Sequence, residues 1–190
     1  MRDSDAEGQR QGAEAAAREI CMQMLTVAPR TRAQLAGALR RRGVPEQAAE
    51  AVLGRYADVG LIDDAAFARA WVESRHHGRG LARRTLSAEL RRRGVAEEDV
   101  RDAISGLDPE QETATARRLV AGRLPATRGQ PPPVRARRLV GMLARKGYPP
   151  AVAYRVVSEA LKQEGPDAAA ADLDAIDTDF EVPVVDTETG

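Results

Sequence analysis

A single pattern of apolar and polar positions occurs three times along the chain. Each copy has two leucines four residues apart, a basic cluster, a glycine and then a second apolar pattern with helical spacing. The copies are Leu35, Leu39, Arg40–Arg42 and Gly43; Leu86, Leu90, Arg91–Arg93 and Gly94; and Leu139, Leu143, Arg145, Lys146 and Gly147. Their glycines are 51 and 53 residues apart. A nearly constant period predicts tandem structural units rather than one irregular globule.

Within each copy the apolar spacing predicts helices. In the first copy, helices are expected over 13–26 and 31–42, with Gly43 as a left-handed cap and a third helix ending near Gly60. The second copy has a predicted break at 77–80 and a helix capped at Gly94. The third copy predicts helices near 109–123, 133–146 and 150–163. The result is nine helices in three sets of three.

Composition supports a helical fold. Only two Phe, one Trp and three Tyr are present, so Ala, Leu and Val must fill the core, and no alternating strand pattern occurs. The sequence predicts an all-α protein whose three tandem three-helix repeats form an elongated, curved array, with a disordered acidic C-terminal tail. The predicted segments are a flexible N-terminus over 1–12, repeats over 13–60, 61–106 and 107–163, and the tail over 164–190.

The formal net charge of zero hides a marked asymmetry. Residues 1–163 carry all 29 Lys and Arg and 20 acidic residues, whereas 164–190 carry nine acidic residues and no basic one. A basic body with an acidic tail is therefore expected. The tail could fold back on the body and compete with DNA, or it could be a solvating appendage without a specific target.

Several classes of protein receive no support. One Cys and the lack of a signal-like apolar run predict a cytoplasmic protein without disulfides, and no stretch approaches the roughly 20 apolar residues of a membrane span. No phosphate loop, metal signature or nucleophile elbow is present, so neither an enzyme nor a cofactor is expected. His76 and His77 are adjacent and cannot chelate one metal as an i, i+4 pair would, which favours a helix-end role or contact with a partner. Cys21 is expected to pack the first helix.

The sharpest local signal is the stretch from Leu61 to Phe67. Asp63 is expected to cap the next helix, and Asp64 to interact with the helix dipole in its first turn, which leaves no carboxylate pair for acid/base chemistry. Phe67 and Trp71 could stack on unpaired bases, but their spacing with Ala70 favours a buried helix face.

The middle repeat contains an extended motif: Gly60-Leu61-Ile62-Asp63-Asp64, Phe67, Ala68, Trp71, Val72, Arg75, Arg79-Gly80-Leu81, Arg84, Leu86, Glu89-Leu90 and Gly94-Val95. This motif resembles that of the RecX family of recombination regulators. The flanking repeats fit the three tandem three-helix units of that family. The resemblance implies a non-enzymatic protein that binds RecA, lies in or caps its nucleoprotein filament, and damps strand exchange, ATP hydrolysis and stimulated LexA self-cleavage.

Basic residues at repeated positions are the candidate contact residues. The predicted set for RecA or DNA is Arg40, Arg41, Arg75, Arg79, Arg83, Arg84, Arg91, Arg92, Arg93, Arg138, Arg145 and Lys146. Positive charge in a last helical turn also favours the helix dipole, so a structural role is open for any one arginine. The helices after Gly43 and Gly94 begin with carboxylates, which disfavours a helix-turn-helix that reads bases and favours contact with the DNA backbone.

Two hypotheses follow. In the first, a monomer binds the RecA filament together with single- or double-stranded DNA, without sequence specificity, and inhibits RecA. In the second, the protein binds DNA alone and affects recombination by occupying the substrate, with a steep salt dependence.

Overall fold

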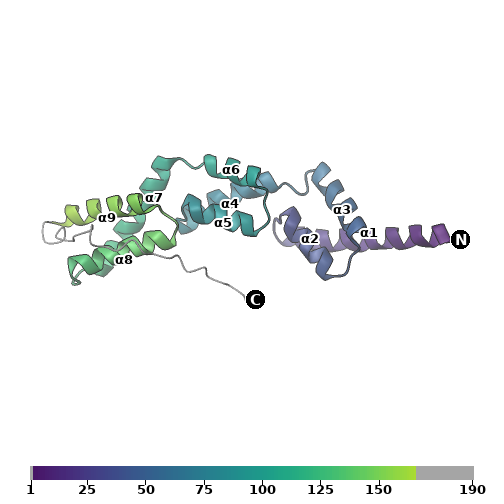
Figure 1. The fold of residues 1–190 in the computed structure, drawn as a ribbon, viewed down its shortest axis with the longest axis horizontal. Coiled ribbons are helices and arrows are strands. Elements are labelled where there is room, and N and C mark those ends of the chain that lie inside the picture. The colour runs from purple at the N-terminus through teal and green to yellow at the C-terminus, as the bar shows by residue number, and fades with distance from the viewer. Residues whose placement is uncertain (1, 166–190) are drawn as a thin grey trace. The chain divides into compact units, whose positions relative to one another are not determined.

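The structure, a computed structural model, describes residues 2–165, and within them every regular element is helical (Figure 1). The elements of this part of the chain are α1 (Arg2–Val27), α2 (Arg32–Arg41), α3 (Glu46–Asp58), α4 (Asp64–Arg79), α5 (Arg83–Arg92), α6 (Glu97–Ser105), α7 (Pro109–Arg123), the short 3-10 helix η1 (Leu124–Thr127), α8 (Pro132–Arg145) and α9 (Pro150–Glu164). The all-α prediction is confirmed, and the nine α-helices of residues 2–165 correspond to the nine expected from sequence.

The predicted helix boundaries depend on local signals that the structure confirms. The glycines after α2, α5 and α8 have φ angles of 73°, 77° and 89°, the left-handed conformation that a residue with a Cβ adopts at a cost. At the start of α4, Asp63 Oδ1 accepts a hydrogen bond from the Ala66 N–H at 2.7 Å. The Thr31 hydroxyl likewise caps α2 by accepting from the Gln34 N–H at 3.2 Å.

Two expectations about the chain ends are corrected. Helix α1 begins at Arg2, so residues 2–12 are helical, whereas the sequence predicted a loose start over 1–12. Its residues include no proline to stop the helix, and Arg10 pairs with Glu7 one turn earlier. Glu164, which the sequence assigned to the acidic tail, is the last residue of α9. The rest of the predicted tail, residues 166–190, lies outside the described residues.

Helix α9 extends to Glu164 because two arginines hold its carboxylate. Arg128 donates to Glu164 Oε1 at 3.1 Å, and the buried Arg135 of α8 donates to Oε2. These hydrogen bonds, that from Arg135 above all, hold the pKa of Glu164 below its usual range. The sequence alone gave no sign that this carboxylate has partners 36 and 29 residues earlier.

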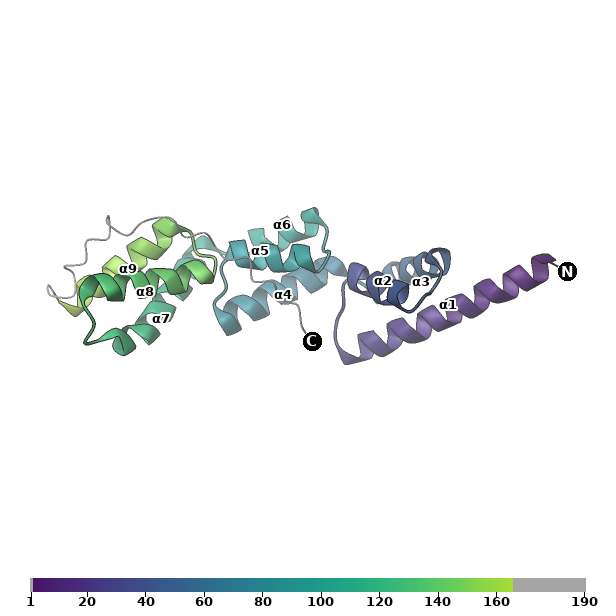
Figure 2. The ribbon, with the colours of Figure 1, turned by 60° about the horizontal axis from the view of Figure 1, so that its bottom comes forward.

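The chain divides into two compact units. Unit 1 contains residues up to 74 together with 86–106, and unit 2 contains 75–85 together with the chain from 107 onward. In unit 1 the apolar faces of α1, α2 and α3 form one core, which includes Leu35, Leu39 and Leu53. In unit 2 helix α9 packs on α7 and α8, and the core includes Leu139, Leu143 and Val157 (Figure 2). The unit boundary therefore falls inside the middle sequence repeat, within α4 and α5.

The buried face of α4 differs from the prediction. Ala68, Val72 and His76, spaced four residues apart, are the buried positions. Phe67 and Trp71 are only half-buried and lie outside the core. The sequence interpretation placed the bulky aromatic side chains inside, but the small Ala68 and Val72 allow closer packing on the adjacent face of the same helix.

Candidate interaction surfaces

A joint in unit 1 links the start of α2 to α4 and to the end of α5. The Thr31 hydroxyl donates to the Arg93 carbonyl at 2.6 Å, and the Arg32 N–H donates to Asp64 Oδ1 at 2.9 Å. Gly94 lies so close to α2 that a Cβ on it would be 2.3 Å from the Cβ of Ala33. Burial raises the pKa of Asp64, and the hydrogen bond from Arg32 opposes that rise. The hydrogen bonds of Thr31 and Asp64 therefore connect the first sequence repeat to the second.

The same joint occurs a second time, in unit 2. The Ala82 N–H donates to the Lys146 carbonyl at 2.8 Å, and the Arg83 N–H donates to Glu112 Oε1 at 2.9 Å. A Cβ on Gly147 would lie 2.4 Å from the Thr85 hydroxyl oxygen. In both joints, the first amide of one repeat's second helix is capped by a carboxylate from the next repeat's first helix. The joints thus fix where the basic clusters of the second and third repeats lie within their units.

Some of the predicted contact residues are engaged within the chain. Arg91 donates two hydrogen bonds to Glu97, at 2.8 and 2.7 Å, and these lower the pKa of Glu97. Arg83 pairs with Glu112 at 3.3 Å. The Arg93 guanidinium lies 3.7 Å from the centre of the Trp71 ring, and Lys146 Nζ donates to the Arg79 carbonyl at 2.6 Å. These groups have structural partners that the sequence did not reveal.

Other predicted residues present unpaired charge. Exposed arginines whose side chains have no partner within residues 2–165 are Arg40, Arg41, Arg84, Arg92, Arg138 and Arg145. Arg40, Arg41 and Arg92 belong to unit 1, and the other three belong to unit 2. Of the remaining two predicted residues, Arg75 is half-buried and Arg79 is exposed at the end of α4.

The structure brings two of these arginines together with a third that the sequence did not single out. Arg138 and Arg145, two turns apart on α8, line a cavity of about 360 Å³ in unit 2 with Arg123, the last residue of α7. All three side chains are exposed, and none has a partner within the described chain. Arg123 is not in the set of contact residues predicted from sequence, because it ends the first helix of its repeat, whereas the repeated basic clusters end the second helices. Three arginines that line one cavity are suited to bind an anion such as a phosphate.

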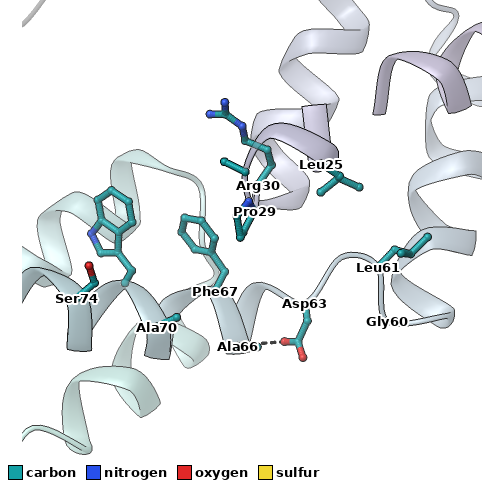
Figure 3. Close-up of a pocket in the computed structure, with 12 residues that line it drawn as sticks. Leu25, Pro29, Arg30, Gly60, Leu61, Asp63, Ala66, Phe67, Ala70 and Ser74 are labelled. Atoms are coloured by element: carbon teal, nitrogen blue, oxygen red, sulfur yellow. Dashed lines mark hydrogen bonds between the residues drawn. The ribbon is translucent and has the colours of Figure 1, made fainter. Parts of the chain in front are cut away.

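A second cavity, in unit 1, is apolar. Its volume is about 510 Å³, and Phe67, Trp71, Leu25 and Leu61 are among the residues that line it (Figure 3). The Phe67 and Trp71 rings are stacked, with centroids 5.7 Å apart and an interplanar angle of 16°. The prediction that these two aromatic residues belong to the core is therefore wrong, because they form the wall of an open cavity.

The side chains of His76 and Cys21 are buried and contribute to packing within their units. The His76 side chain is 1% exposed, with Nδ1 2.9 Å from the Leu81 carbonyl and Nε2 3.0 Å from the Thr115 hydroxyl. Nδ1 must carry the proton that reaches the carbonyl, so Nε2 accepts from Thr115. Cys21 is fully buried in the unit 1 core, and burial raises the pKa of its thiol.

The described residues contain neither a membrane-spanning helix nor a cluster of metal ligands. No helix in the described part of the chain is long and apolar enough to cross a membrane. Over residues 2–165, no group of three or more His, Cys, Asp or Glu side chains is arranged to hold a metal ion.

The fold and these surfaces define an all-α protein built from tandem three-helix repeats. Three family patterns match in succession: the first three-helix domain of RecX over residues 17–55, the second over 63–104 and the third over 110–157. The chain belongs to the RecX family, as its relatives also show.

Relatives named Regulatory protein RecX match most of the chain. That of Thermobifida fusca (strain YX) is 64% identical over 151 residues, which are 80% of this chain and 82% of the relative. That of Streptomyces lividans is 62% identical over 151 residues, 80% of each chain. That of Amycolatopsis mediterranei (strain U-32) is 44% identical over 161 residues, 85% of this chain and 92% of the relative.

Solved structures of two RecX proteins have the same fold. One, a regulatory protein RecX, gives a TM-score of 0.74 at 24% identity and covers 84% of this chain and 78% of its own. RecX from Lactobacillus salivarius gives a TM-score of 0.68 at 16% identity, with 78% of this chain and 97% of its own chain covered. At these identities the likeness concerns the fold alone.

Proposed function

We propose that this protein is a negative regulator of RecA that binds the RecA–DNA filament and inhibits strand exchange, ATP hydrolysis and coprotease activity. Membership of the RecX family supports a regulatory role, and its relatives bear the name Regulatory protein RecX. The protein acts in the cytoplasm as a monomer and needs no catalytic group of its own.

The observation that carries the proposal is the cavity lined by Arg123, Arg138 and Arg145. These guanidinium groups have no partner within the described residues, so no internal ion pair has to break before they bind phosphate oxygens. Contacts of this kind recognise the backbone of any DNA sequence. Unpaired positive charge is present in both units, at Arg40, Arg41 and Arg92 in unit 1 and at Arg84 in unit 2.

The third helices of the first two repeats, α3 and α6, do not suit base reading. In α3 the exposed side chains include Glu46 and Glu50, and in α6 they include Glu97, Glu98 and Asp102. A recognition helix with this surface would bring carboxylates against DNA phosphates, which is unfavourable. This acidic surface supports contact with the DNA backbone over binding of an operator sequence.

The test removes the three positive charges that line this cavity. A variant with Arg123, Arg138 and Arg145 replaced by Gln keeps side-chain length and removes three positive charges from one cavity. The matched control replaces Arg69, Arg101 and Arg155 by Gln. These three arginines are exposed, form no hydrogen bond or ion pair within the described residues, and do not line that cavity. Arg83, Arg91 and Arg93 are left unchanged because their substitution would also disturb the contacts described above.

RecA-driven strand exchange is then measured with increasing amounts of each protein. The first variant should need a much higher concentration for half-inhibition, and the control should match the unmodified protein. Equal loss in both variants would mean that only net charge matters, and full inhibition by the first variant would remove the cavity from the account.

The second candidate function is sequence-independent DNA binding that blocks recombination by occupying the substrate. The same unpaired arginines support it. It predicts that affinity for bare DNA, with a slope of about −0.9 in log K against log salt for each phosphate neutralised, accounts for all inhibition. Retention of RecA by the immobilised protein after nuclease treatment would exclude it.

A further inference from the structure

We propose that the cavity walled by Phe67 and Trp71 is a docking site for a protein partner that inserts a large apolar side chain with a carboxylate beside it. The inference rests on the proposed function, which makes that partner RecA in its filament. It assigns protein recognition to an apolar cavity of unit 1, whereas the arginine cavity of unit 2 binds phosphate.

The cavity has the character of an apolar receptor. Carbon atoms of Leu25, Leu61, Phe67 and Trp71 dominate its wall, and Figure 3 shows Phe67 and Ala70 facing it from α4. A volume of about 510 Å³ exceeds what a single buried water needs and has room for a leucine, methionine or phenylalanine side chain.

Two polar groups of the cavity wall are already engaged. Asp63 Oδ1 accepts from the Ala66 N–H at 2.7 Å, and Trp71 Nε1 donates to Glu89 at 2.8 Å. A flipped nucleobase needs hydrogen-bond partners for its edge as well as a stacking surface, and this wall offers few. The described geometry therefore favours an apolar side chain over a base.

Exposed large apolar side chains occur in the cavity wall and at positions next to it in sequence. Leu61 in its wall is 49% exposed, while Val27 and Val59, each next in sequence to a lining residue, are 80% and 65% exposed. Three of the five large hydrophobic residues that the described chain exposes therefore lie in or next to the cavity wall. Exposed large apolar side chains at a cavity are typical of sites of protein interaction.

Two arginines at the cavity indicate which charge the partner should carry. Arg30 lines the cavity, and its Nε atom is buried without a hydrogen-bond partner. The Arg93 guanidinium lies over the Trp71 ring. A carboxylate on the partner would form a charge-assisted hydrogen bond with the Arg30 guanidinium. Charge complementarity thus specifies an acidic residue beside the inserted apolar side chain.

The first test fills the cavity without removing charge. Ala70 is exposed, lies in a helix and faces the cavity, so Ala70→Leu should fold normally and occupy part of the space. The matched control is Ala51→Leu, at an exposed position of α3 that does not line the cavity. Affinity is measured against immobilised RecA–single-stranded DNA filaments, and separately against the same DNA without RecA.

Ala70→Leu is expected to weaken filament binding at least tenfold and to leave binding to bare DNA unchanged, whereas Ala51→Leu changes neither. Equal filament affinity for the two variants would overturn the docking site. Failure of the unmodified protein to bind filaments would instead refute the proposed function, and this inference with it.

The second test identifies the occupant directly. A photoreactive p-benzoyl-phenylalanine is placed at position 61, in the cavity wall, or at position 51 as a control. Illumination of the filament complex should join position 61 to RecA, with position 51 giving far less product. Cross-linking of position 61 to DNA would contradict the proposal, because it would assign the aromatic wall to base stacking, and absence of any product would contradict it as well.

Discussion

Replacing Gly94 by Ala should break the joint that links the first two repeats in unit 1. Gly94 has a φ of 77°, and a Cβ there would lie 2.3 Å from the Cβ of Ala33, far inside contact distance. Gly43 is the natural control, since its φ is 73° and a Cβ on it would meet no atom within 4 Å. The comparison therefore separates backbone strain from loss of the joint.

The magnitudes follow from the contacts. Both substitutions place an L-residue in the left-handed region, which costs about 1–2 kcal/mol. Gly94→Ala should in addition weaken the hydrogen bond from Thr31 to the Arg93 carbonyl, about 0.5–1.5 kcal/mol, and that from the Arg32 N–H to the Asp64 carboxylate, about 1.5–3 kcal/mol. Gly94→Ala is thus expected to lower the free energy of unfolding by about 2–4.5 kcal/mol more than Gly43→Ala does.

Urea titration monitored by tryptophan fluorescence measures this difference in the unit concerned, because Trp71 is the sole tryptophan and lies in unit 1. With a slope of about 1–3 kcal/mol per molar urea, the midpoint of Gly94→Ala should lie clearly below that of Gly43→Ala. Coincident midpoints for the two variants would refute the joint as a source of stability.

Three further predictions concern stability and reactivity. His76→Phe should lower the free energy of unfolding by about 2–4 kcal/mol, measured by calorimetry, because the buried Leu81 carbonyl and Thr115 hydroxyl lose their partner; an unchanged melting temperature would contradict the assignment. The folded protein lowers the pKa of Glu164, so the contribution of this carboxylate to stability should be present above the usual carboxyl pKa, about 4.3, and should be lost as the pH falls through the folded value. The difference in unfolding free energy between the unmodified protein and Glu164→Gln should therefore vanish in acid. A difference that does not depend on pH would refute the ion pair. Cys21 should react with a thiol reagent slowly in the native protein and fast in denaturing urea, and rapid native labelling would show that it is accessible.

The parts of the fold that follow from local pattern were predictable. The leucine pairs of all three repeats, Leu35 with Leu39, Leu86 with Leu90, and Leu139 with Leu143, are fully buried, as their spacing indicated. The glycine caps were predictable because only a few residues before each glycine determine the end of the helix. Helical periodicity is a local signal, so it indicates which residues face inward within one helix.

The joints and the two cavities were not predictable, because they depend on residues far apart in sequence. The hydrogen bond between Thr31 and Arg93 joins residues 62 positions apart and forms only after both repeats fold. The local sequence around either residue does not indicate its partner. The buried face of α4 was misassigned because periodicity allows two neighbouring stripes, and packing of the small Ala68 and Val72 decided between them. Arg123 joins Arg138 and Arg145 only through the packing of unit 2.

The most direct test of the central claim is ATP hydrolysis by RecA on single-stranded DNA, with increasing amounts of this protein at two DNA concentrations that both saturate RecA. Regulation through the filament predicts the same half-inhibitory concentration at both. A half-inhibitory concentration that rises in proportion to the DNA would contradict it, because occupation of bare DNA would then explain the whole effect.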